Sequence, residues 1–138
     1  MKQSGPMQTM EQKRARYALA RIEEFARLDK TWQEGICRCA NQLPALIHMN
    51  GLGQALAFYK SKGKDGGYAE LYALIGRWLC TEADGKVFTN AQGGDALGAI
   101  TQASMQEYMR AQGEAQALLE WVKKFAMALL KHEQDTRD

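Results

Sequence analysis

Residues 104–133 read SMQEYMRAQGEAQALLEWVKKFAMALLKHE and carry the longest helical pattern in the chain. Ser104 and Glu107 have the spacing of a capping box, in which each side chain accepts the other residue's backbone amide. Apolar residues then recur at intervals of three and four, which places them on one face of a helix. They are Tyr108, Ala111, Ala115, Leu118, Val122, Phe125, Ala126 and Leu129. The pattern predicts one long amphipathic helix that ends near Glu133.

A capping box and an apolar stripe also occur near the beginning of the sequence. Thr9 and Gln12 have capping-box spacing, so a helix is expected to begin there. Its apolar residues fall within an arc roughly 120° wide. They are Ala15, Ala18, Leu19, Ile22, Phe25 and Ala26. Thr31 with Glu34 predicts the start of a second helix, which Pro44 should kink or restart because proline lacks a backbone donor.

The middle of the chain alternates helical patterns with turns. Asn50-Gly51 is a natural helix end, and helices are expected over 52–61 and 68–80 with a flexible turn at 62–67. Residues 81–94 show no period and predict a long loop, after which Asp95 can cap a short helix.

Length and composition point to one globular domain. The chain has 138 residues, of which 46% are hydrophobic and 25% charged, and this excludes disorder and a disulfide scaffold. No segment alternates apolar and polar residues convincingly. We therefore expect a single all-α domain over 1–138, a compact bundle of about five to seven helices, with flexible ends at 1–8 and 134–138.

Targeting signals are not evident. The opening MKQSGPMQTMEQ has no apolar segment of the kind found in signal peptides. The longest apolar run, Phe125 to Leu130, is far shorter than a membrane span, and three cysteines do not suit a secreted disulfide framework. A soluble cytoplasmic protein with no membrane partner is expected.

No catalytic or metal site is expected. Cys37 and Cys39 lie two residues apart in a predicted helix, so their side chains point about 200° apart and cannot share one ion. Glu23 and Glu24 are adjacent and also diverge. His48 sits among apolar residues and is interpreted as a core-edge or surface histidine. The glycine-containing segments lack the residues of a nucleotide-binding loop, so no cofactor is expected either.

Charge is unevenly distributed along the chain. Residues 1–64 contain 11 Lys and Arg against 5 Asp and Glu, whereas residues 65–138 contain 7 against 11. A basic front half suggests a polyanion or an acidic partner. The alternative is that these charges belong to solvated helix faces, lysines at a helix end also being favoured by the helix dipole.

The candidate phosphate-binding residues form two groups. One group lies outside the apolar stripe of the first helix, in an expected exposed arc joined by Tyr17, and the other lies at the end of helix 52–61. The residues are Lys13, Arg14, Arg16 and Arg21 in the first group and Lys60, Lys62 and Lys64 in the second. Such cations can bind backbone phosphates without reading sequence.

The spacing of the aromatic residues predicts where most of them lie. Trp78, Trp121 and Phe125 fit the apolar stripes, so we expect them in the core rather than as base-stacking platforms. Val87 and Phe88 have no evident stripe within the chain. They are therefore expected on a surface that contacts a partner protein.

Four segments together resemble one known family. They are MEQKRARYALARIEEF (10–25), LPALIHMNGLGQALAFYKSK (43–62), YAELYALIGRWL (68–79) and EAQALLEWVKKFAMALLKHE (114–133). The most specific features are the proline before an Asn-Gly-Leu helix break and the terminal Trp-x-Lys-Lys-Phe-Ala. In this order the segments resemble the small helical subunit of the type III-B CRISPR effector, the Cmr complex of the RAMP module. Residues 81–103 take no part in the resemblance.

The resemblance implies a non-catalytic structural role in RNA-guided antiviral defence. In such complexes, small subunits stack beside a filament of backbone subunits, which hold the guide RNA and cut the target, while the large subunit supplies signalling chemistry. The implied partners are the backbone and large subunits, neighbouring copies of the same chain, guide RNA and single-stranded target RNA. The alternative is a helical adaptor that contacts only protein.

Overall fold

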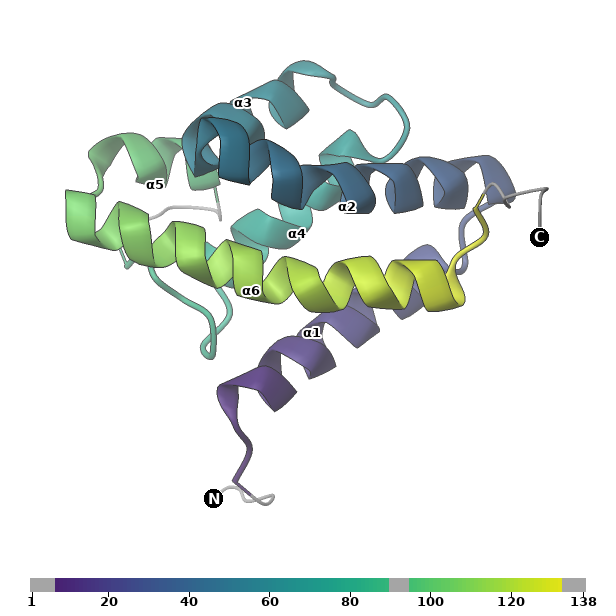
Figure 1. The fold of residues 1–138 in the computed structure, drawn as a ribbon, viewed down its shortest axis with the longest axis horizontal. Coiled ribbons are helices and arrows are strands. Elements are labelled where there is room, and N and C mark those ends of the chain that lie inside the picture. Colours follow the sequence, from purple (N-terminus) through teal and green to yellow (C-terminus); the bar gives the residue numbers. More distant parts are fainter. Residues whose placement is uncertain (1–6, 90–94, 133–138) are drawn as a thin grey trace.

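Six α-helices make up most of the computed structural model, which describes residues 7–89 and 95–132 (Figure 1). They are α1 (Met10–Phe25), α2 (Lys30–Asn50), α3 (Leu52–Ser61), α4 (Tyr68–Cys80), α5 (Ala96–Gln102) and α6 (Met105–Leu129). No strand occurs in these ranges. The prediction of an all-α bundle of five to seven helices is confirmed. The predicted flexible ends lie outside the described residues, except for residues 7 and 8.

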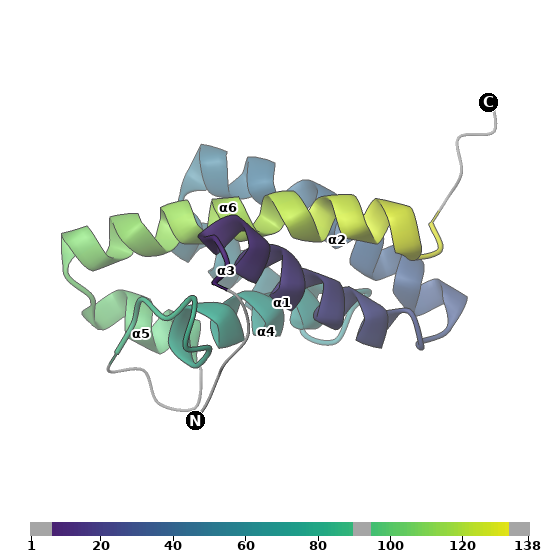
Figure 2. The ribbon, with the colours of Figure 1, turned by 90° about the horizontal axis from the view of Figure 1, so that it is seen from below.

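The two longest helices, α2 and α6, run side by side across the molecule (Figure 1). The helix α1 packs against α6 on the side away from α3, and the turned view shows it beneath α6 and beside α4 (Figure 2). The central helix α4 contacts α2, α3, α5 and α6. One continuous core fills the space between these helices, and no helix in the described ranges is long and apolar enough to cross a membrane.

Two of the three predicted capping boxes are present. In α1, the Gln12 amide donates to Thr9 Oγ1 at 3.0 Å and the Thr9 amide donates to Gln12 Oε1 at 2.8 Å. In α6, the matching bonds join Ser104 and Glu107 at 3.1 and 3.2 Å. Both helices begin where these local side-chain bonds satisfy the first free amides.

The predicted start of α2 is wrong, and the helix does not restart at Pro44. The N-cap is Asp29, whose carboxylate accepts the Trp32 amide at 3.0 Å, so the capping box predicted for Thr31 and Glu34 does not form. Asp29 provides an equally strong cap two residues earlier. The helix also continues through Pro44 to Asn50. Leu43 and Ile47 are fully buried on either side of the proline, and their packing holds the helix together despite the missing hydrogen bond.

The C-terminal end of α6 comes earlier than the pattern predicts. The helix ends at Leu129, and Leu130 takes an extended backbone conformation. The Lys131 amide then donates to Gln33 Oε1 at 2.8 Å, which diverts the chain toward α2. As a result Leu130 is buried, while Leu129, predicted in the core, is half exposed.

The segment after α4 folds back onto that helix. The backbone amides of Val87 and Phe88 both donate to the Leu79 carbonyl, at 2.8 and 3.1 Å. Both side chains are buried in the core, so the prediction that they form a partner-facing surface is wrong. The fold-back needs Gly85, because a Cβ there would lie 2.2 Å from the Trp78 ring. The rest of the predicted loop, 90–94, lies outside the described residues.

Three glycines bring the turn after α3 against α2. A Cβ on Gly35 would lie 2.6 Å from the Gly66 carbonyl oxygen, and a Cβ on Gly67 would lie 2.6 Å from the Gly35 carbonyl oxygen. Gly67 also has a φ of 97°, which L side chains rarely adopt. The Cys39 thiol donates to the Gly66 carbonyl at 3.3 Å and fixes the turn further. This backbone contact determines where the turn of residues 62–67 sits.

We expect Gly35→Ala to lower the free energy of unfolding by about 1–3 kcal/mol, because backbone atoms cannot move aside for the methyl group. Gly113→Ala is the matched control, since it is also helical but meets nothing within 4 Å. The control should gain about 0.5–1 kcal/mol from helix propensity. Urea unfolding of both variants provides the measurement. Equal stabilisation by the two substitutions would show that the contact is not close.

Candidate nucleic-acid interface

All four basic residues predicted in α1 lie beside carboxylates of the same chain. Lys13 Nζ is 3.7 Å and Arg16 Nη2 is 3.5 Å from the Asp84 carboxylate, which belongs to the segment that folds back after α4. Arg16 keeps 63% of its side chain exposed, so this pair is weak and solvent-screened. The loop thereby neutralises part of the α1 charge.

Arg14 is held much more firmly. Its Nε and Nη2 donate to the two oxygens of Glu114 in α6, at 2.7 and 2.9 Å, and its Nη1 donates to Glu11 at 2.6 Å. Only 16% of the Arg14 side chain and 13% of the Glu114 side chain are exposed. The hydrogen bond with Glu114 raises the pKa of Arg14 above its ordinary value, so the guanidinium stays charged in this pair. The bidentate geometry makes it a fixed structural contact.

Arg21 is also enclosed. Its side chain is 13% exposed, Nη2 donates to Glu24 at 2.7 Å, and its guanidinium lies 5.2 Å from the centre of the Tyr17 ring. Tyr17 itself is buried, donates its hydroxyl to the Leu74 carbonyl at 2.7 Å, and packs against Trp78. The predicted exposed arc is therefore wrong for Arg14, Tyr17 and Arg21, because α1 also contacts α4 and is covered over a wider arc than its apolar stripe.

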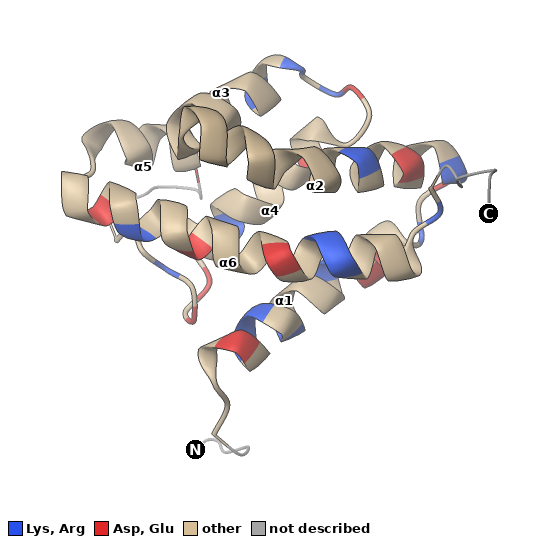
Figure 3. Ribbon diagram, viewed as in Figure 1, with Lys and Arg blue, Asp and Glu red and all other residues tan. Residues whose placement is uncertain are grey.

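The three predicted lysines at the end of α3 are placed differently. Lys60, Lys62 and Lys64 have no carboxylate within 4.0 Å among the residues that the structure describes. They stand on the last turn of α3 and on the turn that follows it, at the edge of the molecule away from α1 (Figure 3). The two predicted groups are thus not brought together in space.

Aromatic rings of α3 and α4 support two of these lysines. Lys60 Nζ lies 4.9 Å from the centre of the Tyr72 ring, and Lys62 Nζ lies 5.3 and 5.5 Å from the ring centres of Phe58 and Tyr68. These distances are those of cation–π contacts, which leave the ammonium groups positively charged. Lys60 is exposed and Lys62 is half-buried. We refer to Phe58, Lys60, Lys62 and Lys64 as the α3 basic edge.

A pocket of about 730 Å³ adjoins the α3 basic edge. It is lined by Lys60, Gly63, Ala69, Tyr72, Ala73, Arg77, Thr81 and Asp95. Lys60 and Arg77 are cationic and Asp95 is anionic, and the Arg77 guanidinium is paired with Glu82 at 2.7 Å. Its volume lies in the range of small-molecule and nucleotide sites. Lys60 is therefore the cation of this lining that has no carboxylate partner among the described residues.

Tyr72 lines this pocket, and two hydrogen bonds hold its side chain in place. Its hydroxyl donates to Asp95 Oδ1 at 2.9 Å and accepts the Leu97 amide at 3.4 Å. Asp95 occupies the predicted N-cap position of α5, but its side chain accepts no hydrogen bond from a backbone amide of that helix. It accepts a hydrogen bond from the Tyr72 hydroxyl instead. Burial raises the pKa of Tyr72 to about 12, so the hydroxyl stays protonated at neutral pH.

The aromatic residues follow the sequence predictions only in part. Cys37, Cys39 and Cys80 are all buried, and among the described residues no group of three His, Cys, Asp or Glu could hold a metal ion. His48 is exposed. Trp78 is in the core as predicted, whereas Trp121 and Phe125 are only partly buried and pack against each other. The Trp121 indole donates to Glu11 at 2.9 Å.

The long-range partners of the α1 cations could not be found from the sequence. Glu114 is 100 residues from Arg14, and Asp84 lies in a segment without periodicity. Local spacing finds ion pairs only within one helix, as for Arg21 and Glu24. The i,i+3 spacing of Glu11 with Arg14 and of Arg21 with Glu24 is a local signal that separates these arginines from the lysines of the α3 basic edge.

The comparisons with known proteins identify a class of CRISPR-associated proteins. The family model described as "CRISPR-associated protein (Cas_Cmr5)" matches residues 10–129. The chain is 34% identical over 92 residues to the CRISPR system Cmr subunit Cmr5 of Thermus thermophilus, covering 67% of this chain and 72% of that protein. It therefore belongs to the Cmr5 family, the small subunits of the type III-B CRISPR Cmr complex.

A solved structure supports the same assignment. The X-ray crystal structure of a CRISPR-associated Cmr5 family protein, also from Thermus thermophilus, matches with a TM-score of 0.71 and 28% sequence identity. The match covers 89% of this chain and 99% of that chain. The resemblance predicted from four sequence segments is thus confirmed, and the all-α fold is shared across nearly the whole relative.

We expect the three thiols to react slowly with a thiol reagent such as DTNB in the native protein. Burial raises the pKa of Cys39 to about 11 and also raises the pKa values of Cys37 and Cys80. Little thiolate is therefore present at neutral pH. All three should react at least about tenfold faster in denaturant. A thiol that reacts equally fast in both states would reveal an activated, accessible cysteine.

Proposed function

We propose that this chain is a non-catalytic, RNA-contacting small subunit of a type III-B CRISPR effector complex. In this proposal, Lys60, Lys62 and Lys64 bind RNA backbone phosphates. One observation carries the assignment of the contact: these are the predicted cations that no described carboxylate neutralises. Arg14 and Arg21 instead serve the fold, while Lys13 and Arg16 are shared with Asp84.

The family supports the proposed setting. A relative is described as a subunit of a CRISPR Cmr system, so the proposed protein partners are the backbone and large subunits and neighbouring copies of the chain. The proposed RNA partners are the guide and the single-stranded target, in the cytoplasm. Contacts with phosphates carry no sequence information, which suits a complex in which guide pairing selects the target.

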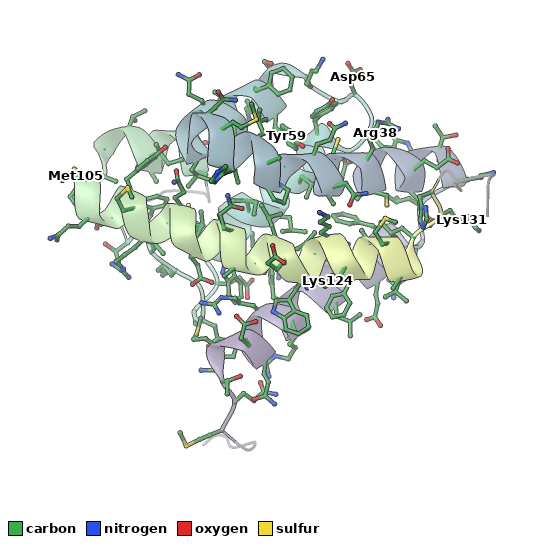
Figure 4. The ribbon with its side chains drawn as sticks, in the orientation of Figure 1. Arg38, Tyr59, Asp65, Met105, Lys124 and Lys131 are labelled. Carbon is green, nitrogen blue, oxygen red and sulfur yellow. The ribbon has the colours of Figure 1, made fainter. Side chains whose placement is uncertain are left out.

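Exposed methionines favour additional contacts with protein. Met105 and Met109 lie one turn apart at the start of α6 and are both largely exposed; Met105 is labelled in Figure 4. Flexible methionine side chains suit adaptable protein surfaces. This end of α6 is our proposed surface for a neighbouring subunit, and it is the observation that favours the protein-only adaptor as the second candidate function.

The RNA contact can be tested by salt dependence. We expect Lys60→Gln, Lys62→Gln and Lys64→Gln together to lower the slope of log K against log salt by about 2 for target RNA, since each single-strand phosphate contact contributes about 0.7. The measurement is target-RNA affinity of the assembled complex across a salt series. Glutamine keeps most of the side chain that covers the aromatic rings.

The matched control removes the same charge elsewhere. Lys86, Lys123 and Lys131 are exposed and have no ion pair among the described residues, so their three glutamine substitutions change net charge equally. The control should leave the slope nearly unchanged. Equal slopes for wild type and the Lys60, Lys62 and Lys64 variant, with normal assembly, would exclude the RNA contact. An assembly defect specific to that variant would favour the adaptor function.

A further inference from the structure

Phe58 has an unusual position in the described part of the chain. Its side chain is 46% exposed, and it is the one aromatic among the large hydrophobic residues that are exposed there; the others are methionine or leucine. It lies on the last two turns of α3, within six residues of three lysines that have no carboxylate partner in the described ranges. An exposed aromatic ring and unpaired cations thus occupy the same edge.

The ring is held in place by its neighbours. Phe58 meets the Tyr68 ring edge-on, with ring centres 6.1 Å apart and an interplanar angle of 89°, and lies 6.2 Å from the Tyr59 ring. Tyr59 is buried and donates its hydroxyl to the Cys39 carbonyl at 2.7 Å, which anchors this aromatic group to α2 (Figure 4). A ring fixed in this way loses little freedom when it binds a ligand.

Lys62 is positioned to serve both the ring and a phosphate. The Lys62 ammonium lies 5.3 Å from the Phe58 ring centre, so it can cover one face of that ring. Nearly half of Phe58 still remains exposed. Lys64, two residues further on, is exposed on the surface. Asp65 is the acidic residue of the turn, and its labelled side chain lies on the outer side of α2 in Figure 4. The local charge therefore remains positive.

We propose that Phe58 is a stacking platform for one unpaired RNA base, whose flanking phosphates are held by Lys62 and Lys64. Single-strand binding sites combine a positively charged path for the backbone with aromatic rings on which bases stack. The α3 basic edge supplies both parts. This inference rests on the proposed function and deepens it, because it adds a contact with a base to the contacts with phosphates.

The chemistry of the site defines what it accepts. Stacking uses the π-face that every base has, so the platform should tolerate any base. Phe58 offers no hydrogen-bonding group to read a base edge. The base must be free of guide pairing at that position, since its face has to be open to the ring. The proposed site therefore binds an unpaired nucleotide whatever its base.

The test uses the assembled complex with target RNA that carries 5-iodouridine at one position at a time. We expect ultraviolet irradiation to crosslink Phe58 at one or a few positions, as mapped by peptide mass spectrometry. Phe58→Leu should abolish that crosslink and weaken target binding about fivefold or more. Phe58→Tyr, which keeps the ring, should retain the crosslink and bind within about twofold of wild type.

The outcomes separate this inference from the proposed function. If Phe58 does not crosslink and Phe58→Leu binds normally, while the lysine variant still loses salt dependence, the platform is excluded and the phosphate contact stands. If the lysine variant also behaves as wild type, both fail. If Phe58→Leu folds but prevents assembly, the ring faces a protein subunit and the inference is wrong. A melting curve of each free chain confirms folding.

Discussion

The Glu114 carboxylate on α6 accepts hydrogen bonds from Arg14 of α1 and Trp78 of α4, so one side chain joins three helices. The Trp78 nitrogen lies 2.8 Å from the oxygen that Arg14 Nε also approaches. Because the Glu114 side chain is largely shielded from water, loss of Arg14 would leave its carboxylate without a cation, whereas Arg14 also pairs with Glu11. Tyr17 packs on the same tryptophan, and Gly85 lets the segment after α4 cross it. The position of α1 depends on these contacts around Glu114 and Trp78.

The seven candidate basic residues fall into two kinds. The cations of α1 neutralise carboxylates of α6, of the segment after α4 and of α1 itself, so their charge is largely used within the chain. The lysines after Phe58 have aromatic neighbours and no such carboxylates among the described residues. The number of basic residues alone does not show which of them have carboxylate partners. Of the seven candidate residues, the three without a described carboxylate partner lie at the opposite edge from α1.

Local patterns predicted the helices well, and long-range contacts account for the errors. The capping boxes at Thr9 and Ser104 are complete within four residues, so sequence alone reveals them. The bond between Arg14 and Glu114 spans 100 residues and leaves no local trace. The prediction for Val87 and Phe88 failed for the same reason, since backbone bonds to Leu79 bury them. The exposure of Phe58 is likewise a tertiary property, because residues of its type are usually in the core.

The central claim is that Arg14 stabilises the fold through its ion pair with Glu114. A double-mutant cycle in the free energy of unfolding tests this claim most directly. The cycle combines Arg14→Ala with Glu114→Gln, which removes the charge but keeps an acceptor for Trp78. Urea unfolding of the wild type, both single variants and the double variant should give a coupling energy of about 1–2 kcal/mol. A coupling energy below about 0.3 kcal/mol, within the error of additivity, would contradict the claim and return Arg14 to the candidate RNA contacts.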